Sequence, residues 1–538
     1  MVSKTTGFRD PGHLFIVRGD VTSIGCDAWL LPADSEVRVE SPWRRALAAM
    51  AGGSRHDDRL IDQALASVRK PLRCQELPGF RRENQGSPWV TDIAVEGDGD
   101  HQGTIDGLHR FVKAVCGSVT TSGRLRLAIP FIGSGEGGWG RRKGDLMLEL
   151  VRAIADVISS DGSPDIVLVL RNDEAFAAAQ YARQRVFAGR DGGAWPQLDD
   201  GARRLADDLA EKIMDDRLVV FIGAGASVSA GLPSWDGLLR KLAEDAGLHS
   251  GEDFAELPAL DRAWLIEREL ADSPDRKGPT LGKLIKQRFS GNRAPSLVHQ
   301  IIASLPVREF ATTNYDCLFE DAARNSGSPV ELIADGLPAR RDRWLVKLHG
   351  TTTKPDSIVL SRGDYLDYAS RRAALAGVVQ AMLLTRHMLF VGFSLADDNF
   401  VRIAHDVRNA LGKRPTGANP AGTALTLDPS AAKLRLWSDF IDIRYIDVSP
   451  GTPSHDVPDA VKARGVEILL DRALAIVVTD RMSYLLDHSF DGLLSKDDRA
   501  ARDVITEAVK RTANNGSASA VRLRQLAERL GHEDRPQR

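Results

Sequence analysis

The chain has 538 residues, which is too long for one ordinary hydrophobic core, so its length predicts about three domains. Hydrophobic residues make up 43% and charged residues 27% of the sequence, which is typical of a soluble globular protein. The formal net charge is only −3, so no overall basic field favours binding to nucleic acid or to an anionic membrane.

The cysteines and the apolar runs exclude further classes of protein. Cys26, Cys74, Cys116 and Cys317 are widely separated and form no CxxC pair, which excludes a four-cysteine zinc ribbon and argues against a disulfide framework. Residues 1–12 lack the apolar core of a signal peptide, and the most apolar runs fall well short of the roughly 20 residues that span a bilayer. We therefore expect a cytoplasmic protein.

Short apolar runs alternate with helical patterns in the first part of the chain. The clearest predicted strands are 14–17, 28–31, 125–129 and 166–170, and the clearest helices are 144–158 and 173–186. This alternation predicts an α/β domain over residues 1–186. Residues 187–200 are rich in Gly, Asp and Pro without periodicity, which predicts a linker.

A second α/β unit is predicted over residues 201–450, followed by a helical region over 451–538. Its predicted strands are 218–222, 308–312, 344–348, 388–392 and 441–446. The last region has amphipathic spacing and mixed charges, so we expect it to serve packing or oligomerisation rather than nucleic-acid binding, and we expect a homo-oligomer.

A glycine-rich segment directly follows the predicted strand 218–222. It consists of Gly223, Ala224, Gly225, Ala226 and Ser227. Glycine permits positive φ and close backbone approach, so the amide N–H groups of this segment can face a pyrophosphate at the start of a helix. The following turn contains Pro233 and Trp235. It either folds over the ligand or is a surface turn with Trp235 packed in the core.

Polar residues follow two further predicted strands. Thr313, Asn314 and Asp316 come after the strand 308–312, and His349 comes after the strand 344–348. Open α/β sheets bind ligands at the carboxyl ends of their strands, so these residues are candidates for one site. Asn314 or Asp316 can also simply cap the next helix, and a lone histidine such as His349 is usually structural. Aimed at one crevice, His349 becomes a credible general base.

These motifs, in this order, resemble the sirtuin-like NAD-binding domain over residues 201–450, which implies a Rossmann-like parallel sheet there. The resemblance places the cradle at Gly223–Ala224–Gly225, with Ser227 at the family's serine position, and implies NAD as the ligand. Asn314 and Asp316 then lie near the nicotinamide and its ribose, and His349 is the base. Pro233 belongs to the family's glycine–hydrophobic–proline segment, and a late loop contributes Gly392 and Ser394.

Departures from that family narrow the expected activity. The zinc ribbon of sirtuin deacylases is missing, and Ser234–Trp235–Asp236 stands where Asp-Phe-Arg is usual. This form, with the Thr-Asn-Tyr-Asp and Gly-Phe-Ser-Leu-Ala-Asp-Asp strings, resembles the prokaryotic sirtuin-like NADases of antiphage defence, which deplete the cell of NAD. The resemblance therefore implies an NAD glycohydrolase.

The residue types suit this chemistry, because cleavage of the nicotinamide–ribose bond passes through an oxocarbenium-like state. His349 can deprotonate a ribose hydroxyl or steer water, Asn314 can hold water or ribose, Asp316 can fix the carboxamide, and no metal is needed. Two alternatives stay open. One is a protein ADP-ribosyltransferase or deacylase, and the other is a non-enzymatic sensor of NAD or ADP-ribose.

The first region carries a second set of nucleotide-binding motifs. They comprise Asp20 and Val21, and later Gly133, Ser134, Gly135, Glu136 and Gly137. This pattern resembles the macrodomain, a three-layer α/β fold, which implies binding of ADP-ribose or a derivative. The asparagine and glycines of hydrolytic macrodomains are absent after residue 31, so we expect binding without hydrolysis, or a degenerate scaffold. A pocket that binds would suit regulation of the enzyme.

Overall fold

The computed structural model describes residues 10–50, 58–93, 102–121, 123–133, 142–248, 252–272, 279–333, 342–412, 419–428, 430–448, 452–513 and 515–531. Packing divides the chain into two compact units. The N-terminal unit contains Met1–Asp207, Asn325–Gly327 and Ile468–Arg538, and the central unit contains Asp208–Arg324 and Ser328–Glu467. The domain boundaries predicted from the sequence stay predictions. The packing itself groups the chain from Ile468 onward with the N-terminal unit.

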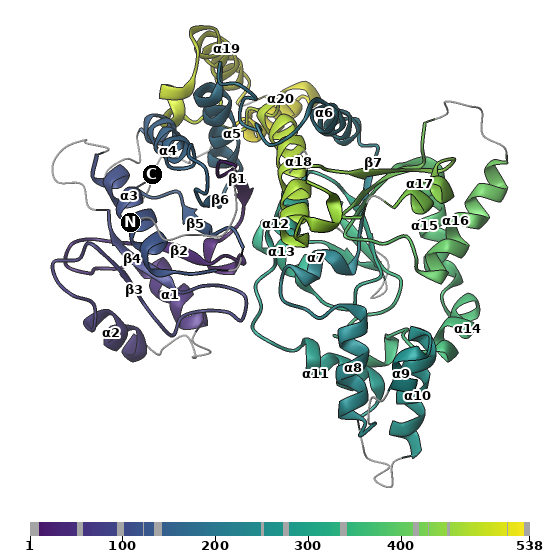
Figure 1. Cartoon of the computed structure of the whole chain (residues 1–538). Coiled ribbons are helices and arrows are strands. Elements are labelled where there is room, and N and C mark those ends of the chain that lie inside the picture. Colours follow the sequence, from purple (N-terminus) through teal and green to yellow (C-terminus); the bar gives the residue numbers. More distant parts are fainter. Residues whose placement is uncertain are drawn as a thin grey trace. The chain divides into compact units, whose positions relative to one another are not determined.

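The N-terminal unit is built on a six-stranded mixed sheet in the order β1-β6-β5-β2-β4-β3 (Figure 1). The strands are β1 (Leu14–Arg18), β2 (Ala28–Ala33), β3 (Cys74–Glu76), β4 (Pro88–Asp92), β5 (Arg126–Pro130) and β6 (Asp165–Leu170). Only β3 pairs antiparallel; the other neighbours are parallel. The strands predicted from apolar runs are confirmed, because those runs are buried on both faces, as parallel strands require.

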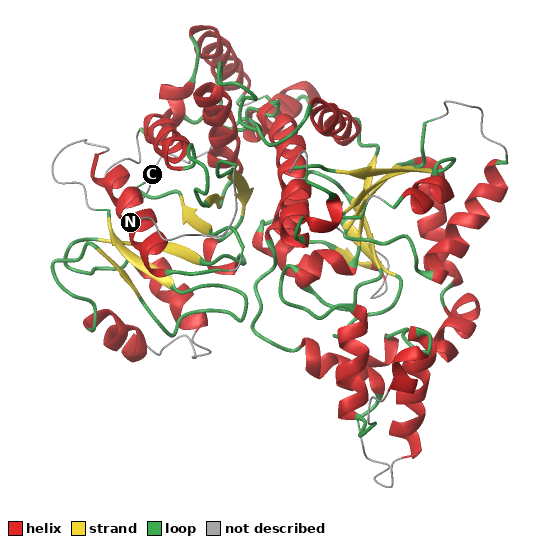
Figure 2. Cartoon of the chain, in the orientation of Figure 1, coloured by secondary structure: helices red, strands yellow, loops and turns green. Residues whose placement is uncertain are grey.

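The helices of this unit, drawn in red in Figure 2, come from both ends of the chain. They are α1 (Ser41–Met50), α2 (Asp58–Ala66), α3 (Gln102–Ser118), α4 (Lys143–Val157), α5 (Asp173–Phe187), α19 (Lys496–Thr512) and α20 (Ala518–Arg529), with the 3₁₀ turns η1 (Val21–Ser23) and η5 (His488–Leu493). The boundary between the two units falls within α6 (Asp200–Met214) and α18 (Asp459–Thr479).

A buried charge ties the C-terminal helices into this unit. Asp471 on α18 is fully buried and accepts hydrogen bonds from Arg183 Nη1 at 2.7 Å and Trp195 Nε1 at 2.9 Å. Burial alone would raise the pKa of Asp471, but Arg183 and the nearby His13 offset it, so the pKa is lowered. Trp195 lies in the stretch predicted as a linker, whose residues 188–199 form turns that pack through this contact.

The central unit is a seven-stranded parallel sheet in the order β13-β12-β11-β7-β8-β10-β9. Its strands are β7 (Leu218–Ile222), β8 (Glu309–Thr312), β9 (Glu331–Leu332), β10 (Trp344–Lys347), β11 (His387–Val391), β12 (Gly422–Thr426) and β13 (Ile441–Tyr445). The predicted parallel sheet of α/β type is therefore confirmed, and β12 is a strand that the sequence did not indicate. The chain passes from β7 to β8 on one side, while β11 lies on the other side.

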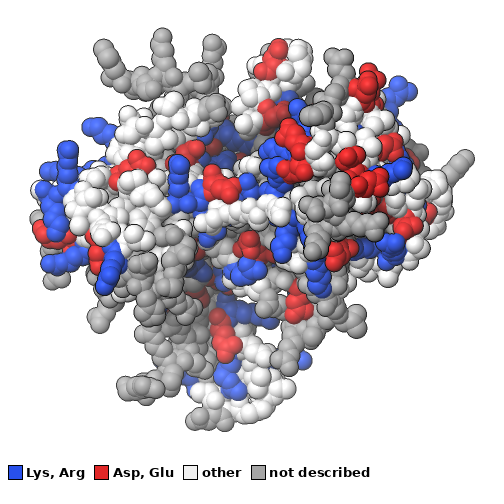
Figure 3. Space-filling view, turned by 90° about the horizontal axis from the view of Figure 1, so that it is seen from below, with Lys and Arg blue, Asp and Glu red and all other residues white. Residues whose placement is uncertain are grey.

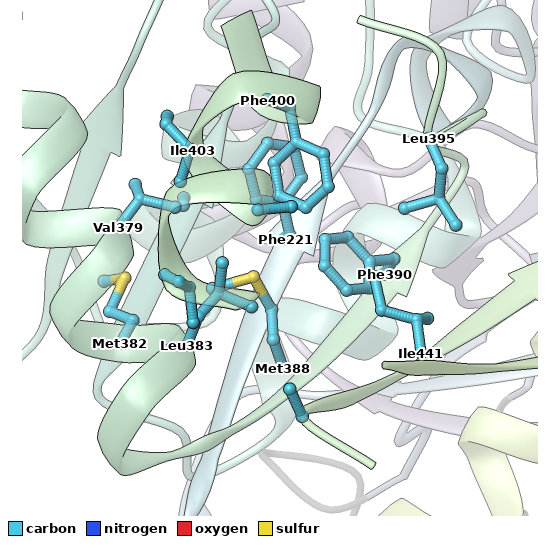
Figure 4. Packing of buried hydrophobic residues seen from close by; sticks show 14 of the residues in the cluster. Phe221, Val379, Met382, Leu383, Met388, Phe390, Leu395, Phe400, Ile403 and Ile441 are labelled. Atoms are coloured by element: carbon cyan, nitrogen blue, oxygen red, sulfur yellow. The ribbon is translucent and has the colours of Figure 1, made fainter. Parts of the chain in front are cut away.

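Helices lie along both faces of this sheet (Figure 1). They are α7 (Ala224–Val228), α12 (Leu297–Ser304), α13 (Leu318–Asn325), α15 (Ala373–Thr385), α16 (Asp398–Leu411) and α17 (Ala431–Trp437). One face is packed by α15, α16 and α17 around Phe221, Phe390 and Phe400, whose rings are 5.2–5.4 Å apart (Figure 4). This aromatic core fixes the carboxyl ends of β7 and β11 against α16.

A smaller helical module projects from the sheet. It contains α8 (Trp235–Asp245), α9 (Glu252–Glu256), α10 (Ala259–Asp272) and α11 (Leu281–Phe289), with α14 (Arg362–Arg371) beside α10. Its own hydrophobic cluster includes Leu239, Ile266 and Ile285 and extends to Tyr315 and Leu360. Because Tyr315 follows β8, the module is packed directly against a strand end of the sheet. The short turns η3 (Pro355–Ser357) and η4 (Ser454–Asp456) complete the unit.

Surface charge, helix hydrophobicity and possible metal ligands were the features on which the composition argument depended. Basic and acidic side chains are mixed over the face shown in Figure 3, without a continuous basic field. None of the described helices combines the length and the apolar character that crossing a membrane requires. Within the described residues, no three or more His, Cys, Asp and Glu side chains gather as metal ligands would.

Candidate functional site

A cavity of about 700 Å³ opens at the carboxyl ends of the central strands. It lies where β7 is flanked by β8 and β11, which is the switch point at which open α/β sheets bind their ligands. The sequence-predicted residues that line it are Ala224, Gly225, Ser227, Pro233, Trp235, Thr313, Asn314, Asp316, His349, Gly392 and Ser394. Gly223 and Ala226 lie in the same loop but do not line the cavity.

The two glycine loops of the site interlock. Gly223 N donates to Val391 O at 2.9 Å, and Gly225 N donates to Gly392 O at 2.9 Å. A Cβ on Gly223 would lie 2.4 Å from Gly392 O, so this glycine serves close backbone approach; its φ is −105°. The positive φ is at Gly392, at +67°. The glycines therefore bind the loops to each other.

Hydrogen bonds within and between these loops leave fewer amide groups available to a phosphate than the sequence suggested. The amides of Gly223, Gly225 and Ala226 all donate to backbone oxygens within the protein. Of the amides at 223–226, only that of Ala224 has no acceptor recorded among the described residues. The prediction that the whole segment presents N–H groups to a diphosphate has to be reduced to Ala224, because an amide already bonded cannot also bind the ligand well.

The predicted polar residues after β8 form one hydrogen-bonded network. Asn314 Nδ2 donates to Gly223 O at 3.1 Å and to Ser227 Oγ at 3.2 Å, and Ser227 Oγ donates to Asp316 Oδ2 at 2.9 Å. Asp316 Oδ1 also accepts from Leu318 N at 3.0 Å, so this residue both lines the site and caps α13. Asn314 Oδ1 is buried and has no hydrogen-bond partner among the described residues. Asn314 is one of the residues that line the cavity, so this oxygen is an unpaired acceptor of a lining residue.

A buried lysine holds this loop from behind. Lys347 on β10 is about 1% exposed and donates to the backbone oxygen of Asp316, while its Nζ lies 2.6 Å from Glu320 Oε1. Burial works against the charged form of Lys347, but Glu320 and the nearby acidic groups raise its pKa above the usual range. A charged lysine therefore fixes the loop that carries Asn314 and Asp316.

His349 follows β10 and is almost fully buried, with its side chain 3% exposed. Burial is the main cause that lowers the pKa of His349, against the opposing charge of Asp397. The ring meets Tyr365 and Tyr368 edge-on, with centroids 5.5 and 6.0 Å away. At neutral pH the imidazole is therefore uncharged and can accept a proton.

The structure adds site residues that the sequence did not assign. Asp397 and Tyr365 line the cavity beside His349, and Arg362 lies at the cavity with two hydrogen bonds to Asp261, at 2.7 and 2.9 Å. Asp397 belongs to the Gly-Phe-Ser-Leu-Ala-Asp-Asp string after β11, and its place after a strand was the signal that could have found it. Tyr365, on a helix 16 residues after His349, gave no comparable signal.

One wall of the cavity is aromatic. Trp235 and Phe289 each have their ring centroid 6.4 Å from that of Tyr315, and all three line the cavity. Trp235 thus both packs against the module and faces the ligand space. Ring faces of this kind suit a flat aromatic group.

The N-terminal unit has a second cavity, of about 380 Å³. Of the predicted ligand residues, Val21 and Gly133 line it, Asp20 does not, and Ser134, Glu136 and the two glycines Gly135 and Gly137 lie outside the described residues. Trp43, Lys143 and Phe490 are further lining residues. Phe490 belongs to η5 of the C-terminal segment, and a Cβ on Gly144 of α4 would lie 2.8 Å from its backbone oxygen. The C-terminal segment is therefore part of this pocket's wall.

The carboxylate of Asp20 is already bonded. Its Oδ1 accepts from Thr22 N at 3.0 Å and from Thr22 Oγ1 at 2.7 Å, and its Oδ2 accepts from Arg171 Nη2 at 2.5 Å. Arg171 also lies over the Trp43 ring, 5.5 Å from its centroid. A ligand amine would therefore have to compete with Arg171 for Asp20.

Comparison with known proteins finds a family match and curated relatives for this chain. Residues 308–446 match the family described as SIR2-like domain, which confirms the predicted sirtuin-like resemblance for this part of the central unit. The chain is 30% identical over 208 residues to "NAD(+) hydrolase ThsA" of Bacillus cereus (strain MSX-D12), covering 38% of this chain and 42% of that protein. It is 32% identical over 211 residues to "NAD(+) hydrolase ThsA" of Enterococcus faecium, with the same coverage. The match therefore spans about two fifths of these curated relatives.

Two further similarities concern other proteins. "Defense-associated sirtuin 2" of Bacillus subtilis is 25% identical over 223 residues, covering 39% of this chain and 21% of that protein. Among solved structures, the Oceanobacillus iheyensis macrodomain with ADP is 13% identical, with a TM-score of 0.27. That similarity covers 33% of this chain and 92% of that chain.

Proposed function

We propose that this protein hydrolyses NAD to nicotinamide and ADP-ribose, in the cytoplasm and without a metal. The observation that carries the proposal is that two residues line one cavity of about 700 Å³: Asn314, whose buried Oδ1 has no partner among the described residues, and His349, a buried uncharged base. Relatives named NAD(+) hydrolase support it from the sequence side. An aromatic wall with Trp235 offers a face for the nicotinamide ring.

The groups of the cavity suit a dissociative cleavage. The bond between ribose C1′ and the nicotinamide nitrogen breaks, and its electron pair leaves with neutral nicotinamide. A water oxygen forms the new bond to C1′, and its proton passes to His349 and then to solvent. Asn314 Oδ1 accepts a hydrogen bond from that water or from a ribose hydroxyl, and Ala224 N–H is available to a phosphate oxygen.

Product analysis after incubation with NAD tests this proposal against its alternatives. Free nicotinamide and free ADP-ribose in equal amounts support hydrolysis, whereas ADP-ribose retained on protein supports a transferase. Deacylation would instead require an acylated peptide to be consumed together with NAD. If NAD is bound but stays intact, with and without added ADP-ribose, the non-enzymatic sensor is supported and hydrolysis is rejected.

We also propose a role in antiphage defence, because one matched relative is named a defense-associated sirtuin. Bacteria that carry the wild-type gene should lose NAD during infection and give fewer plaques than bacteria with the His349→Ala variant. Equal plaque numbers and stable NAD in both would reject the defence role while leaving the enzymology intact. Light scattering on the purified chain tests the expected homo-oligomer.

A ligand of the ADP-ribose type at the N-terminal cavity is the regulatory part of the proposal. Lys143, at the first turn of α4, and Arg171 give this cavity two positive side chains against the carboxylate of Glu40, and the Trp43 ring gives it one flat face. Calorimetric titration of ADP-ribose into the full chain should give heat that Lys143→Glu weakens. Lys113→Glu, on the exposed face of α3, is the matched control. Equal heats in all three proteins would mean that this cavity does not bind the ligand.

A further inference from the structure

Asp397 stands beside His349 without a role in the steps described so far. Its Oδ1 lies 3.6 Å from His349 Nε2, and its side chain is 14% exposed at the cavity. It is the N-cap of α16, so it enters the site from β11 and α16, whereas His349 enters from β10. Two separate strand ends therefore bring a carboxylate and an imidazole together.

Both oxygens of this carboxylate are held in place. Tyr365 Oη donates to Asp397 Oδ2 at 2.7 Å, and Phe400 N donates to Asp397 Oδ1 at 2.9 Å. On the other side, Asn399 Nδ2 lies 3.4 Å from His349 Nε2. Hydrogen bonds from a helix and from a tyrosine fix the orientation of Asp397, so its charge has a set distance from the ring.

The charge around His349 is otherwise mixed. The titratable and charged groups that face it are Asp364, Tyr365 and Tyr368 of α14, Arg372 before α15, and Asp397 at the start of α16. Asp364 is engaged in the capping box of Ser361, and the charge of Arg372 opposes a positive imidazole. Among the acidic groups of the described residues, Asp397 is the one that lies within 4 Å of the ring nitrogen.

We propose that Asp397 is a positioning residue that carries the counter-charge for His349 when its imidazole takes a proton, an assignment that rests on the proposed hydrolysis of NAD. The protonated ring would be a buried cation, and a buried charge without a partner is costly. A carboxylate at 3.6 Å offsets that cost where water cannot. Tyr365 serves the same end by holding the carboxylate toward the ring.

Asp397→Asn is the informative variant, because asparagine caps a helix as well as aspartate and keeps the shape of the side chain. It should lower kcat by roughly 10²-fold and change KM little, since the counter-charge is needed only once the proton has moved. Asp406→Asn, on the exposed side of α16, removes the same charge and should leave the rate unchanged. Tyr365→Phe should give a smaller loss than Asp397→Asn.

The pH profile separates this role from a structural one. The base is active when neutral, so kcat/KM falls as the pH drops through the pKa of His349. Asp397 stabilises the protonated ring, so its replacement should lower that pKa and move the acid limb to lower pH. An unshifted limb would overturn the proposal, even if Asp397→Asn were slow. Asp397→Ser, which also caps a helix, serves as the second variant if Asp397→Asn fails to fold.

Titration of ¹³C-labelled histidines by NMR gives a readout that needs no turnover. The His349 resonance is identified by its loss in His349→Ala. A lower pKa in Asp397→Asn than in the wild type supports the counter-charge even if the wild type proves not to hydrolyse NAD, in which case only the proposed function fails. The same pKa in both proteins rejects the role of Asp397, whatever the enzyme does.

Discussion

The two cavities of this protein were both expected to bind NAD-derived nucleotides, yet their polar groups differ in how far they are already engaged. In the central cavity, Asn314 keeps one amide oxygen unpaired and His349 stays uncharged. Beside the N-terminal cavity, between the lining residues Gly19 and Val21, the carboxylate of Asp20 is bonded at both oxygens by Thr22 and Arg171. The central cavity therefore has polar groups that can bind a substrate as they stand. Asp20, by contrast, would have to break its hydrogen bond with Arg171 before it could bind a ligand.

This difference shows what a matched motif can and cannot establish. A motif fixes which side chain stands at a position, but binding a ligand depends on which hydrogen-bonding atoms of that side chain are not already paired within the protein. Asp20 and Asn314 each occupy the position that a family pattern assigns, and only Asn314 keeps an unpaired oxygen. The central cavity is therefore expected to act on its ligand, and the N-terminal cavity to respond to one.

The largest effect is expected when the proposed base, His349, is removed. His349→Ala should reduce nicotinamide release by about 10²–10⁴-fold, because no other described side chain offers an uncharged imidazole to the cavity. Binding of ADP-ribose by the N-terminal cavity should be unaffected. The measurement is initial rates of nicotinamide release by chromatography.

A second buried histidine provides the matched control. Burial lowers the pKa of His387 to about 4, and its Nε2 lies 3.0 Å from Thr423 Oγ1 at the amino end of β11, away from the cavity. His387→Ala should reduce thermal stability and keep turnover. If both variants lost activity equally, the role of His349 would be structural and the contrast between the two cavities would disappear.

Much of the fold follows from apolar runs in the sequence. The run at 218–222 is buried at every residue, and a continuous apolar run of that length predicts a central parallel strand. The strand β12 was not predicted, because Gly422 and Thr423 interrupt its apolar residues and leave no continuous apolar run. The helices of the small module have short amphipathic patterns whose packing on Tyr315 depends on contacts distant in the chain.

The site was predictable where residues follow strands and not where they reach it from elsewhere. Asn314 and His349 follow β8 and β10, so the carboxyl-end rule for parallel sheets brings them to one cavity. Tyr365 reaches Asp397 from α14, and no spacing along the chain encodes that contact. The loss of the Gly223 and Gly225 amides to Val391 and Gly392 likewise depends on how two loops meet.

The interlocked glycines allow a test of intermediate size. In Gly392→Ala the new Cβ would lie 2.5 Å from Ala226 N at a φ of +67°, so the loops must separate. We expect the free energy of unfolding to fall by roughly 1–3 kcal/mol more in Gly392→Ala than in Gly247→Ala, and we expect turnover to be reduced. Gly247 has a φ of +76° but open space around it, so it reports the backbone cost alone. Equal melting temperatures would show that the close approach of the two loops contributes nothing.

The smallest effect is expected in the N-terminal cavity. Arg171→Ala frees Asp20 Oδ2, so ADP-ribose should bind up to about fivefold more tightly, which is the size of a partly exposed ion pair. Arg152→Ala removes an exposed arginine that pairs with Glu149 on α4 and should leave the affinity unchanged. Calorimetry on the His349→Ala background keeps turnover out of the measurement. Weaker binding in Arg171→Ala would mean that Arg171 itself binds the ligand. Both cavities would then have polar groups available to a ligand, and the contrast between them would disappear.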